Sequence, residues 1–233
     1  MTSPAVAKTI GVIGGLGPAA TLDFFDKVLR ATPAKRDQDH LHLIIDNNPR
    51  LPDRNLALRG EGPSPGPALA AMARGLEKNG AQGVVMVCNT AHAWQSEIEA
   101  SLTVPFLSMV DATIAETRAK ARGKVGVLVA DGCRLAGLYQ KGFGADALLL
   151  SDPDKARFMQ AIYAIKAGDK GPSMRKTMAG FAGQLIEQGA GVIVAACTEV
   201  PLALSAEDLA VPFISSTDVL VARTLDFALG VRP

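Results

Sequence analysis

Two stretches of the chain repeat one pattern, and this duplication constrains the fold more than any other feature of the sequence. Residues 80–92 read GAQGVVMVCNTAH, and residues 189–199 read GAGVIVAACTE. In both copies a glycine stands eight positions before the cysteine, which is Cys88 in the first copy and Cys197 in the second. Each copy is later followed by a segment that opens with Val-Pro-Phe. The pattern therefore indicates two related halves.

In each copy, the residues before the cysteine form a short apolar run without polar alternation. Such a run is typical of a strand covered on both faces, as in parallel sheets. Because apolar runs alternate with helical patterns along the chain, we expect the α/β class. We expect two similar α/β domains with parallel-type sheets, related by a pseudo-twofold axis, and an active site in the cleft between them. The first domain comprises residues 1–112 plus 212–233, and the second comprises residues 113–211.

Composition excludes several functional classes. A net charge of +1 argues against binding to nucleic acid or to a membrane surface. No apolar run reaches the length of a membrane span, and the first ten residues lack the basic and apolar regions of a signal peptide. Because the chain has three cysteines and no export signal, we expect the protein to be located in the reducing cytoplasm. The chain has no Cys-x-x-Cys pair and no histidine-rich spacing, so we expect no metal site.

The two repeated cysteines are the strongest candidates for chemistry. Each strand pattern breaks after its cysteine into polar residues, Asn89 and Thr90 in the first copy and Thr198 in the second. This predicts Cys88 and Cys197 at the carboxyl ends of parallel strands, where α/β sheets bind ligands. A helix that starts there would favour the thiolate. Two thiols facing each other across a cleft can act as acid and base on opposite faces of one carbon, as racemisation requires.

A glycine-rich turn at residues 14–18 follows the first predicted strand and contains Leu16. Backbone amides in such a turn can approach an anion closely. The turn lacks the GxGxxG spacing of a dinucleotide site, and no Walker lysine follows it, so a carboxylate is the expected ligand. A helix is predicted over residues 19–30. Its expected inner face carries Leu22, Phe25, Val28 and Leu29.

Two cations are candidates for binding a carboxylate. The loop at residues 47–54 contains two prolines and two arginines. Arg54 at its end is either a solvated surface charge or a bidentate carboxylate ligand. Lys166, at the end of a predicted helix, could supply charge to stabilise a carbanion.

Three further residues allow two interpretations each. His92 lies one helical turn after Cys88, and it either orients a reacting group or is a packed, hydrogen-bonded histidine. Glu199 either activates a neighbouring group or is a first-turn acid of a helix. Cys133 lies in a loop of the second half, where it borders the cleft or is inert.

Five motifs together resemble a known family: GVIGGLGP, NNPRLPDR, VCNTAH, IKAGD and ACTEV. In their order and spacing the chain resembles the cofactor-independent aspartate/glutamate racemases, most closely the aspartate racemases. The resemblance implies two similar α/β domains, an acid/base pair of cysteines, no pyridoxal phosphate or other cofactor, and a homodimer.

Carried over by motif, the resemblance assigns roles to individual residues. Cys88 and Cys197 are the acid/base pair, and Arg54 and Lys166 contact a carboxylate of the substrate. The residues implied to bind the α-carboxylate and the amino group are Asn89, Thr90 and Thr198. Two positions near the substrate's carboxylate depart from the family pattern, because Cys133 and Asn55 stand where threonine is usual.

The sequence therefore predicts an isomerase that interconverts L- and D-aspartate, or the enantiomers of glutamate. Three alternatives stay open. One is an isomerase or decarboxylase of the same fold acting on another α-substituted acid, although decarboxylation needs only one cysteine. Another is a dicarboxylate-binding protein without catalysis. The last is a thiol–disulfide protein that forms a reversible bond between Cys88 and Cys197.

Overall fold

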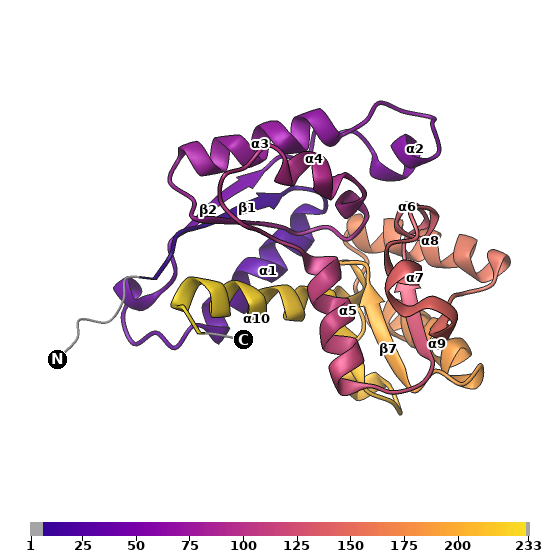
Figure 1. Ribbon diagram of the computed structural model, residues 1–233. Coiled ribbons are helices and arrows are strands. Elements are labelled where there is room, and N and C mark those ends of the chain that lie inside the picture. Colours follow the sequence, from indigo (N-terminus) through magenta and orange to yellow (C-terminus); the bar gives the residue numbers. More distant parts are fainter. Residues whose placement is uncertain (1–6, 232–233) are drawn as a thin grey trace.

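The computed structural model describes residues 7–231 and contains two four-stranded parallel sheets with corresponding strand orders, β2-β1-β3-β4 and β6-β5-β7-β8 (Figure 1). The strands of the first sheet are β1 (Ile10–Gly14), β2 (Leu43–Asn47), β3 (Gly83–Met86) and β4 (Phe106–Leu107). The strands of the second are β5 (Val125–Val129), β6 (Ala147–Leu148), β7 (Val192–Ala196) and β8 (Phe213–Ser215). The predicted α/β class with two parallel sheets is confirmed.

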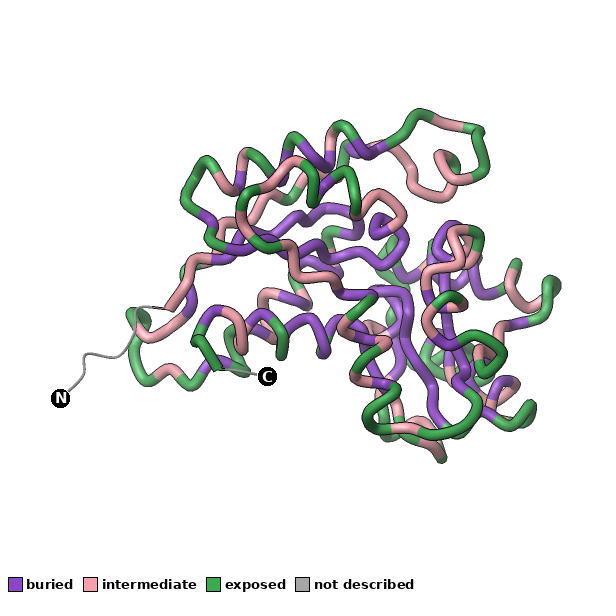
Figure 2. The backbone as a smooth tube through the Cα atoms, viewed as in Figure 1, coloured by how far each residue is buried: buried purple, intermediate pink, exposed green. Residues whose placement is uncertain are grey.

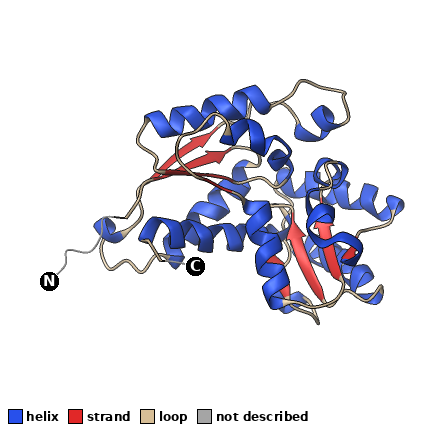
Figure 3. Ribbon diagram, viewed as in Figure 1, coloured by secondary structure: helices blue, strands red, loops and turns tan. Residues whose placement is uncertain are grey.

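Ten α-helices lie between and around these strands in the described part of the chain (Figure 3). Those that precede β5 are α1 (Pro18–Ala31), α2 (Arg54–Leu58), α3 (Gly66–Lys78), α4 (Gln95–Glu99) and α5 (Met109–Lys120). Those that follow β5 are α6 (Asp131–Leu135), α7 (Leu138–Phe143), α8 (Asp152–Lys166), α9 (Pro172–Glu187) and α10 (Ser216–Leu229). Short 3-10 turns are η1 (Asp37–Asp39), η2 (Thr90–Trp94), η3 (Gly144–Asp146), η4 (Val200–Leu202) and η5 (Ala206–Asp208).

The central strands are buried on both faces, as their unbroken apolar sequences predict (Figure 2). In β3, Val84 and Met86 pack towards α3, whereas Val85 packs on the other face with side chains of α1 and α10. In β7, Ile193 packs towards α8 and α9, whereas Val194 packs with Val110 of α5 and with residues of α7. Each sheet is thus enclosed by helices, which leaves the strand ends as the place for a ligand.

Helices α5 and α10 connect the two halves. Each follows the last strand of its own sheet, yet α10 packs against α1, and α5 packs against α7 and β8 (Figure 1). Within the segment 212–233, strand β8 pairs with β7 of the second sheet, whereas α10 packs against the first. The predicted domain boundaries at residues 112 and 211 stay a prediction.

The predicted inner face of the first helix is wrong in part. Val28 is buried as expected, but Leu22 and Leu29 are 67% and 38% exposed. Phe24, which was not expected on the inner face, is buried. The helix is rotated because Thr21 faces inward, where its hydroxyl accepts a hydrogen bond from the Gly15 amide at 3.0 Å. The buried face of α1 therefore consists of Ala20, Thr21, Phe24 and Val28.

No helix within residues 7–231 combines the length and the apolar character needed to cross a membrane. The prediction that the chain starts without a signal peptide depends largely on residues 1–6, which lie outside the described residues.

We expect Gly83→Ala to destabilise the protein, because a Cβ at this position in β3 would overlap the ring of Phe227 in α10. Overpacking of this kind costs about 1–3 kcal/mol of unfolding free energy, measured by urea denaturation. The control is Gly183→Ala in α9, which meets nothing within 4 Å and should add up to about 1 kcal/mol of helix stability. If Gly83→Ala were as stable as the wild type, α10 would not pack on β3 as described.

Candidate active site

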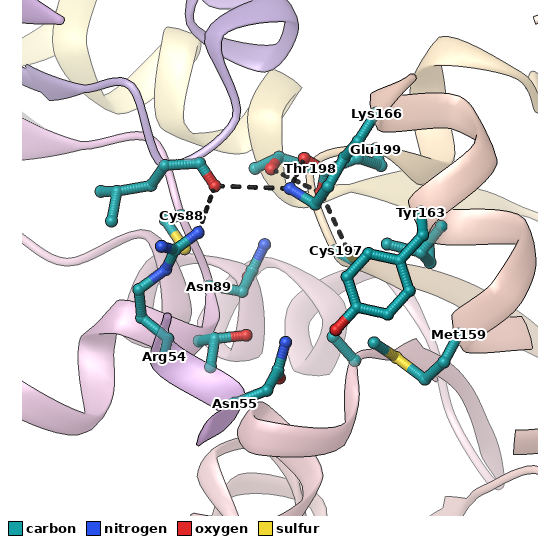
Figure 4. A pocket seen from close by; sticks show the side chains of 14 residues that line it. Arg54, Asn55, Cys88, Asn89, Met159, Tyr163, Lys166, Cys197, Thr198 and Glu199 are labelled. Carbon is teal, nitrogen blue, oxygen red and sulfur yellow. Dashed lines mark hydrogen bonds and ion pairs between the residues drawn. The ribbon is translucent and has the colours of Figure 1, made fainter. Parts of the chain in front are cut away.

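A small pocket, partly open to solvent, lies where the carboxyl ends of the central strands of both sheets meet (Figure 4). Its lining from the first half is Leu16, Arg54, Asn55, Cys88, Asn89 and Thr90. Its lining from the second half is Ala130, Met159, Ile162, Tyr163, Lys166, Cys197, Thr198 and Glu199. Eight of the nine site residues expected from sequence therefore line one pocket, and Cys133 is the exception.

The two pocket cysteines follow equivalent strands. Cys88 comes shortly after β3, Cys197 comes directly after β7, and both are buried. Each is followed by a short 3-10 turn, η2 or η4, rather than by an α-helix. The expected thiolate stabilisation by a helix dipole is wrong for Cys197, because a single 3-10 turn has little macrodipole and burial raises the pKa of this thiol well above its usual range.

Glu199 holds the proton on Cys197. The Cys197 thiol donates to Glu199 Oε2 at 3.1 Å, and the Thr198 hydroxyl donates to the same oxygen at 3.3 Å. The charge of Glu199 adds to the effect of burial in raising the pKa of Cys197. The other oxygen, Oε1, forms an ion pair with Lys166. Glu199 itself is only 4% exposed, so its position favours the interpretation that it acts on neighbouring groups.

Two cations from different halves converge on one backbone oxygen. Arg54 donates from Nη2 to the Leu16 carbonyl at 2.9 Å, and Lys166 Nζ donates to the same carbonyl at 3.4 Å. Burial works to lower the pKa of Lys166, but the charge and hydrogen bond of Glu199, together with the two nearby cysteines, outweigh burial, so the pKa is raised. Asp53 caps the helix that begins with Arg54 by accepting from the Asn55 amide at 2.7 Å. This pocket wall is therefore suited to a carboxylate.

Asn55 bridges the two halves at the pocket. Its Oδ1 accepts a hydrogen bond from the Gly132 amide at 2.8 Å. A Cβ at Gly132 would lie 2.8 Å from both Asn55 Oδ1 and Thr90 Cγ2, so glycine permits the close approach of α6 to the first half. The side-chain nitrogen of Asn55 points into the pocket (Figure 4).

Cys133 lies behind the pocket. It is fully buried in a hydrophobic cluster that also contains Val110 and Tyr139. Burial raises the pKa of the Cys133 thiol far above its usual range. This position offers no thiol to the pocket surface, so of the two interpretations of Cys133 the structure favours an inert core residue over contact with the substrate.

His92 is a packed, hydrogen-bonded histidine, which was one of its two interpretations. Its Nε2 accepts from the Met109 amide at 3.0 Å, so the ring proton is on Nδ1, which donates to the Cys88 carbonyl at 2.8 Å. Burial lowers the pKa of His92 to about 4. The neutral ring thus fixes the backbone of Cys88 to the start of α5.

The apolar wall formed by Met159, Ile162 and Tyr163 of α8, together with Ala130, was not expected from the sequence. A signal was present, because residues three, four and seven positions before Lys166 share its helix face. Within residues 7–231, no group of three or more His, Cys, Asp or Glu side chains gathers in a way that could hold a metal ion.

Comparisons with known proteins agree on one family. The sequence model described as "Asp/Glu/Hydantoin racemase" matches residues 13–224. The broad specificity amino-acid racemase RacX of Bacillus subtilis is 31% identical over 96% of this chain and 99% of its own length. The glutamate racemase of Pseudomonas entomophila is 30% identical, over 67% of this chain and 61% of its own length. Among solved structures, the aspartate racemase of Picrophilus torridus has a TM-score of 0.86 and 28% identity, with 97% of this chain and 95% of that chain covered.

The neutral His92 predicts a pH dependence of stability. The pKa of His92 is about 4 in the folded chain, whereas the ordinary histidine pKa of 6.5 applies to the unfolded chain. As the pH falls from 6.5 to 4, the unfolded chain therefore binds a proton at His92 that the folded chain does not bind. Stability present above pH 6.5 is therefore lost on acidification, by about 3 kcal/mol near pH 4. Urea denaturation of His92→Gln should lack this part of the pH dependence, whereas His42→Gln, at an exposed position, should keep it. Equal pH profiles for wild type and His92→Gln would contradict the assignment.

Proposed function

Because the chain belongs to the Asp/Glu/Hydantoin racemase family, we propose that it interconverts L- and D-aspartate, or the enantiomers of glutamate, with Cys88 and Cys197 as acid and base. Its homologues are racemases, which are isomerases. The observation that carries the proposal is that cysteines at equivalent strand ends of two corresponding sheets line one pocket. The proposed reaction uses neither pyridoxal phosphate nor a metal ion.

The reaction exchanges one proton on each face of the substrate's α-carbon. One cysteine, as thiolate, takes the Cα proton onto its sulfur, and the other, as thiol, gives its proton to the opposite face. The Cys197 thiol donates to Glu199, so Cys197 starts as the acid and Cys88 starts as the base. After one turnover the two sulfurs have exchanged protonation states, and proton exchange with solvent restores the starting form. The same pair can therefore process both enantiomers.

The Cα–H bond of an amino acid is a weak acid, so the carbanion must be stabilised within the pocket. Asn89, Thr90 and Thr198 are donors on the lining, close in sequence to the two cysteines. They are proposed to bind the α-carboxylate and the amino group. Arg54 and Lys166 are proposed to bind a carboxylate beside Leu16, where both already donate to the backbone carbonyl. Preorganised donors of this kind stabilise developing charge without reorganisation during the reaction.

A wider substrate range is a second candidate. Lys166 is already paired with Glu199, and the wall formed by Met159, Ile162 and Tyr163 is largely apolar. These features favour side chains other than a carboxylate, in line with the broad specificity in the printed name of the Bacillus subtilis relative. A panel of aspartate, glutamate and uncharged amino acids distinguishes the two candidates by their kcat/KM values.

The proposal extends to the setting of the enzyme. All three cysteines are free, and a thiol acid/base pair requires them to stay reduced, so we place the enzyme in the cytoplasm. We also propose a homodimer, as the resemblance implies, and two domains formed by residues 1–112 plus 212–233 and by residues 113–211.

Replacement of either pocket cysteine tests the mechanism. Cys88→Ala and Cys197→Ala should each abolish racemisation in both directions, since each direction needs both an acid and a base. Circular dichroism follows the optical activity of L- or D-aspartate without added cofactor. Cys133→Ala is the matched control, because this thiol lies outside the pocket lining, and it should retain racemisation in both directions. Full activity in either pocket variant would refute the two-thiol mechanism.

Arg54→Ala tests carboxylate binding. The loss of charge-assisted hydrogen bonds should lower kcat/KM for aspartate by about 100-fold, while the melting temperature changes little. Arg50→Ala provides a control in the same loop, because Arg50 is exposed and is not part of the pocket lining. If Arg54→Ala instead unfolds readily but keeps its specific activity, the arginine has a structural role.

A further inference from the structure

Asn89, beside Cys88, is held by two side chains that come from distant parts of the chain. The Tyr139 hydroxyl of α7 donates to Asn89 Oδ1 at 2.6 Å. Asn89 Nδ2 in turn donates to the hydroxyl of Ser216, the first residue of α10, at 2.9 Å. All three residues are buried. The amide plane of Asn89 is therefore fixed on both sides within the protein.

The remaining hydrogen-bonding capacity of Asn89 faces the pocket. Ser216 is the one partner that Nδ2 has within residues 7–231, so the second N–H of the amide is free for another acceptor. Asn89 also lines the pocket, and Figure 4 shows its side chain between Cys88 and Cys197. The residue can thus present an N–H donor to a substrate while its oxygen is occupied by Tyr139.

Tyr139 is itself rigidly held. It is fully buried, and its ring stacks on Phe143 of the same helix with a centroid distance of 6.1 Å. It also packs in the hydrophobic cluster that contains Cys133. Burial raises the pKa of the Tyr139 phenol well above its usual range, so the hydroxyl keeps its proton and remains a donor.

We propose that Tyr139 is a positioning residue, whose hydroxyl fixes the Asn89 amide so that its free N–H points at the substrate beside Cys88. This inference rests on the proposed function, in which Asn89 binds the substrate. Because Asn89 belongs to the first half and Tyr139 to the second, the donor is in place only when the two halves are packed together. Substrate binding is thereby coupled to the contact between the halves.

Tyr139→Phe removes the hydroxyl and keeps the ring. Without its donor the Asn89 amide can rotate, so KM for aspartate should rise about tenfold or more. Because the equilibrium constant of a racemisation is one, kcat/KM must fall equally for both enantiomers. The matched control is Thr224→Val in α10, which removes a fully buried hydroxyl that donates to the Leu220 carbonyl at 2.7 Å, away from Asn89. It should lower the melting temperature and leave KM unchanged.

A purely structural role for Tyr139 would give a different result. In that case Tyr139→Phe would lower the melting temperature as Thr224→Val does, but KM and kcat would stay within about twofold of wild type, and the inference would be overturned. If Tyr139→Phe does not fold, the wild type carries the test through the solvent exchange of the Asn89 side-chain amide protons, which a fixed amide slows. Exchange as fast as that of a free side-chain amide would then overturn the inference.

A second readout separates this inference from the proposed function. The side-chain amide protons of Asn89, assigned by comparison with Asn89→Asp, should exchange slowly with solvent in the wild type and at least tenfold faster in Tyr139→Phe. If the wild type racemises neither aspartate nor glutamate, the proposed function is refuted for these substrates. The exchange rates still test whether Tyr139 fixes the Asn89 amide. Equal exchange rates in both proteins would overturn the inference whatever the activity.

Discussion

The site depends on close packing between two halves, each of which contributes one buried strand end. Three polar contacts maintain this packing around the pocket: Lys166 with the Leu16 carbonyl, Asn55 with the Gly132 amide, and Tyr139 with Asn89. Each contact joins a residue of the half that contains the first sheet to a residue of the half that contains the second sheet. The crossing of α5 and α10 between the halves adds apolar contacts to these polar ones. Without this packing, the two cysteines would not share a pocket.

The duplication is not symmetric in its chemistry. Two residues after Cys197 the chain carries Glu199, and two residues after Cys88 it carries Thr90. Only the second cysteine therefore donates its thiol hydrogen to a carboxylate, which is buried and paired with Lys166. In the proposed mechanism this difference decides which sulfur holds the proton before substrate binds. In that mechanism the two copies present one thiol each, and the difference between Glu199 and Thr90 gives the thiols different starting roles.

The sequence was sufficient to predict features that depend on local pattern. The apolar runs before Cys88 and Cys197 predicted buried parallel strands, and the motifs led to Arg54 and Lys166, which lie on the same pocket wall. The short 3-10 turns after the cysteines were not predictable, because the apolar spacing through Trp94 and Ile98 fits an α-helix equally well.

Contacts between distant residues were also beyond the reach of periodicity. Tyr139 and Asn89 are 50 positions apart, and nothing in the sequence around Tyr139 indicates a buried hydroxyl beside the pocket. Cys133 lies in a loop pattern that fits a cleft residue, but the packing of α6 directs its thiol into the core. Only the tertiary structure decides such cases.

The most direct test of the two-thiol account follows deuterium during racemisation in D2O. The reduced protein, without added cofactor, is incubated with L-aspartate and, in parallel, with L-glutamate, and NMR measures the Cα hydrogen of each enantiomer at low conversion. Two thiols on opposite faces predict deuterium in the D-enantiomer formed, while the remaining L-enantiomer keeps its original hydrogen. Deuterium that accumulates in the recovered L-enantiomer as fast as product forms would contradict the account, because one group would then be removing and returning protons on the same face.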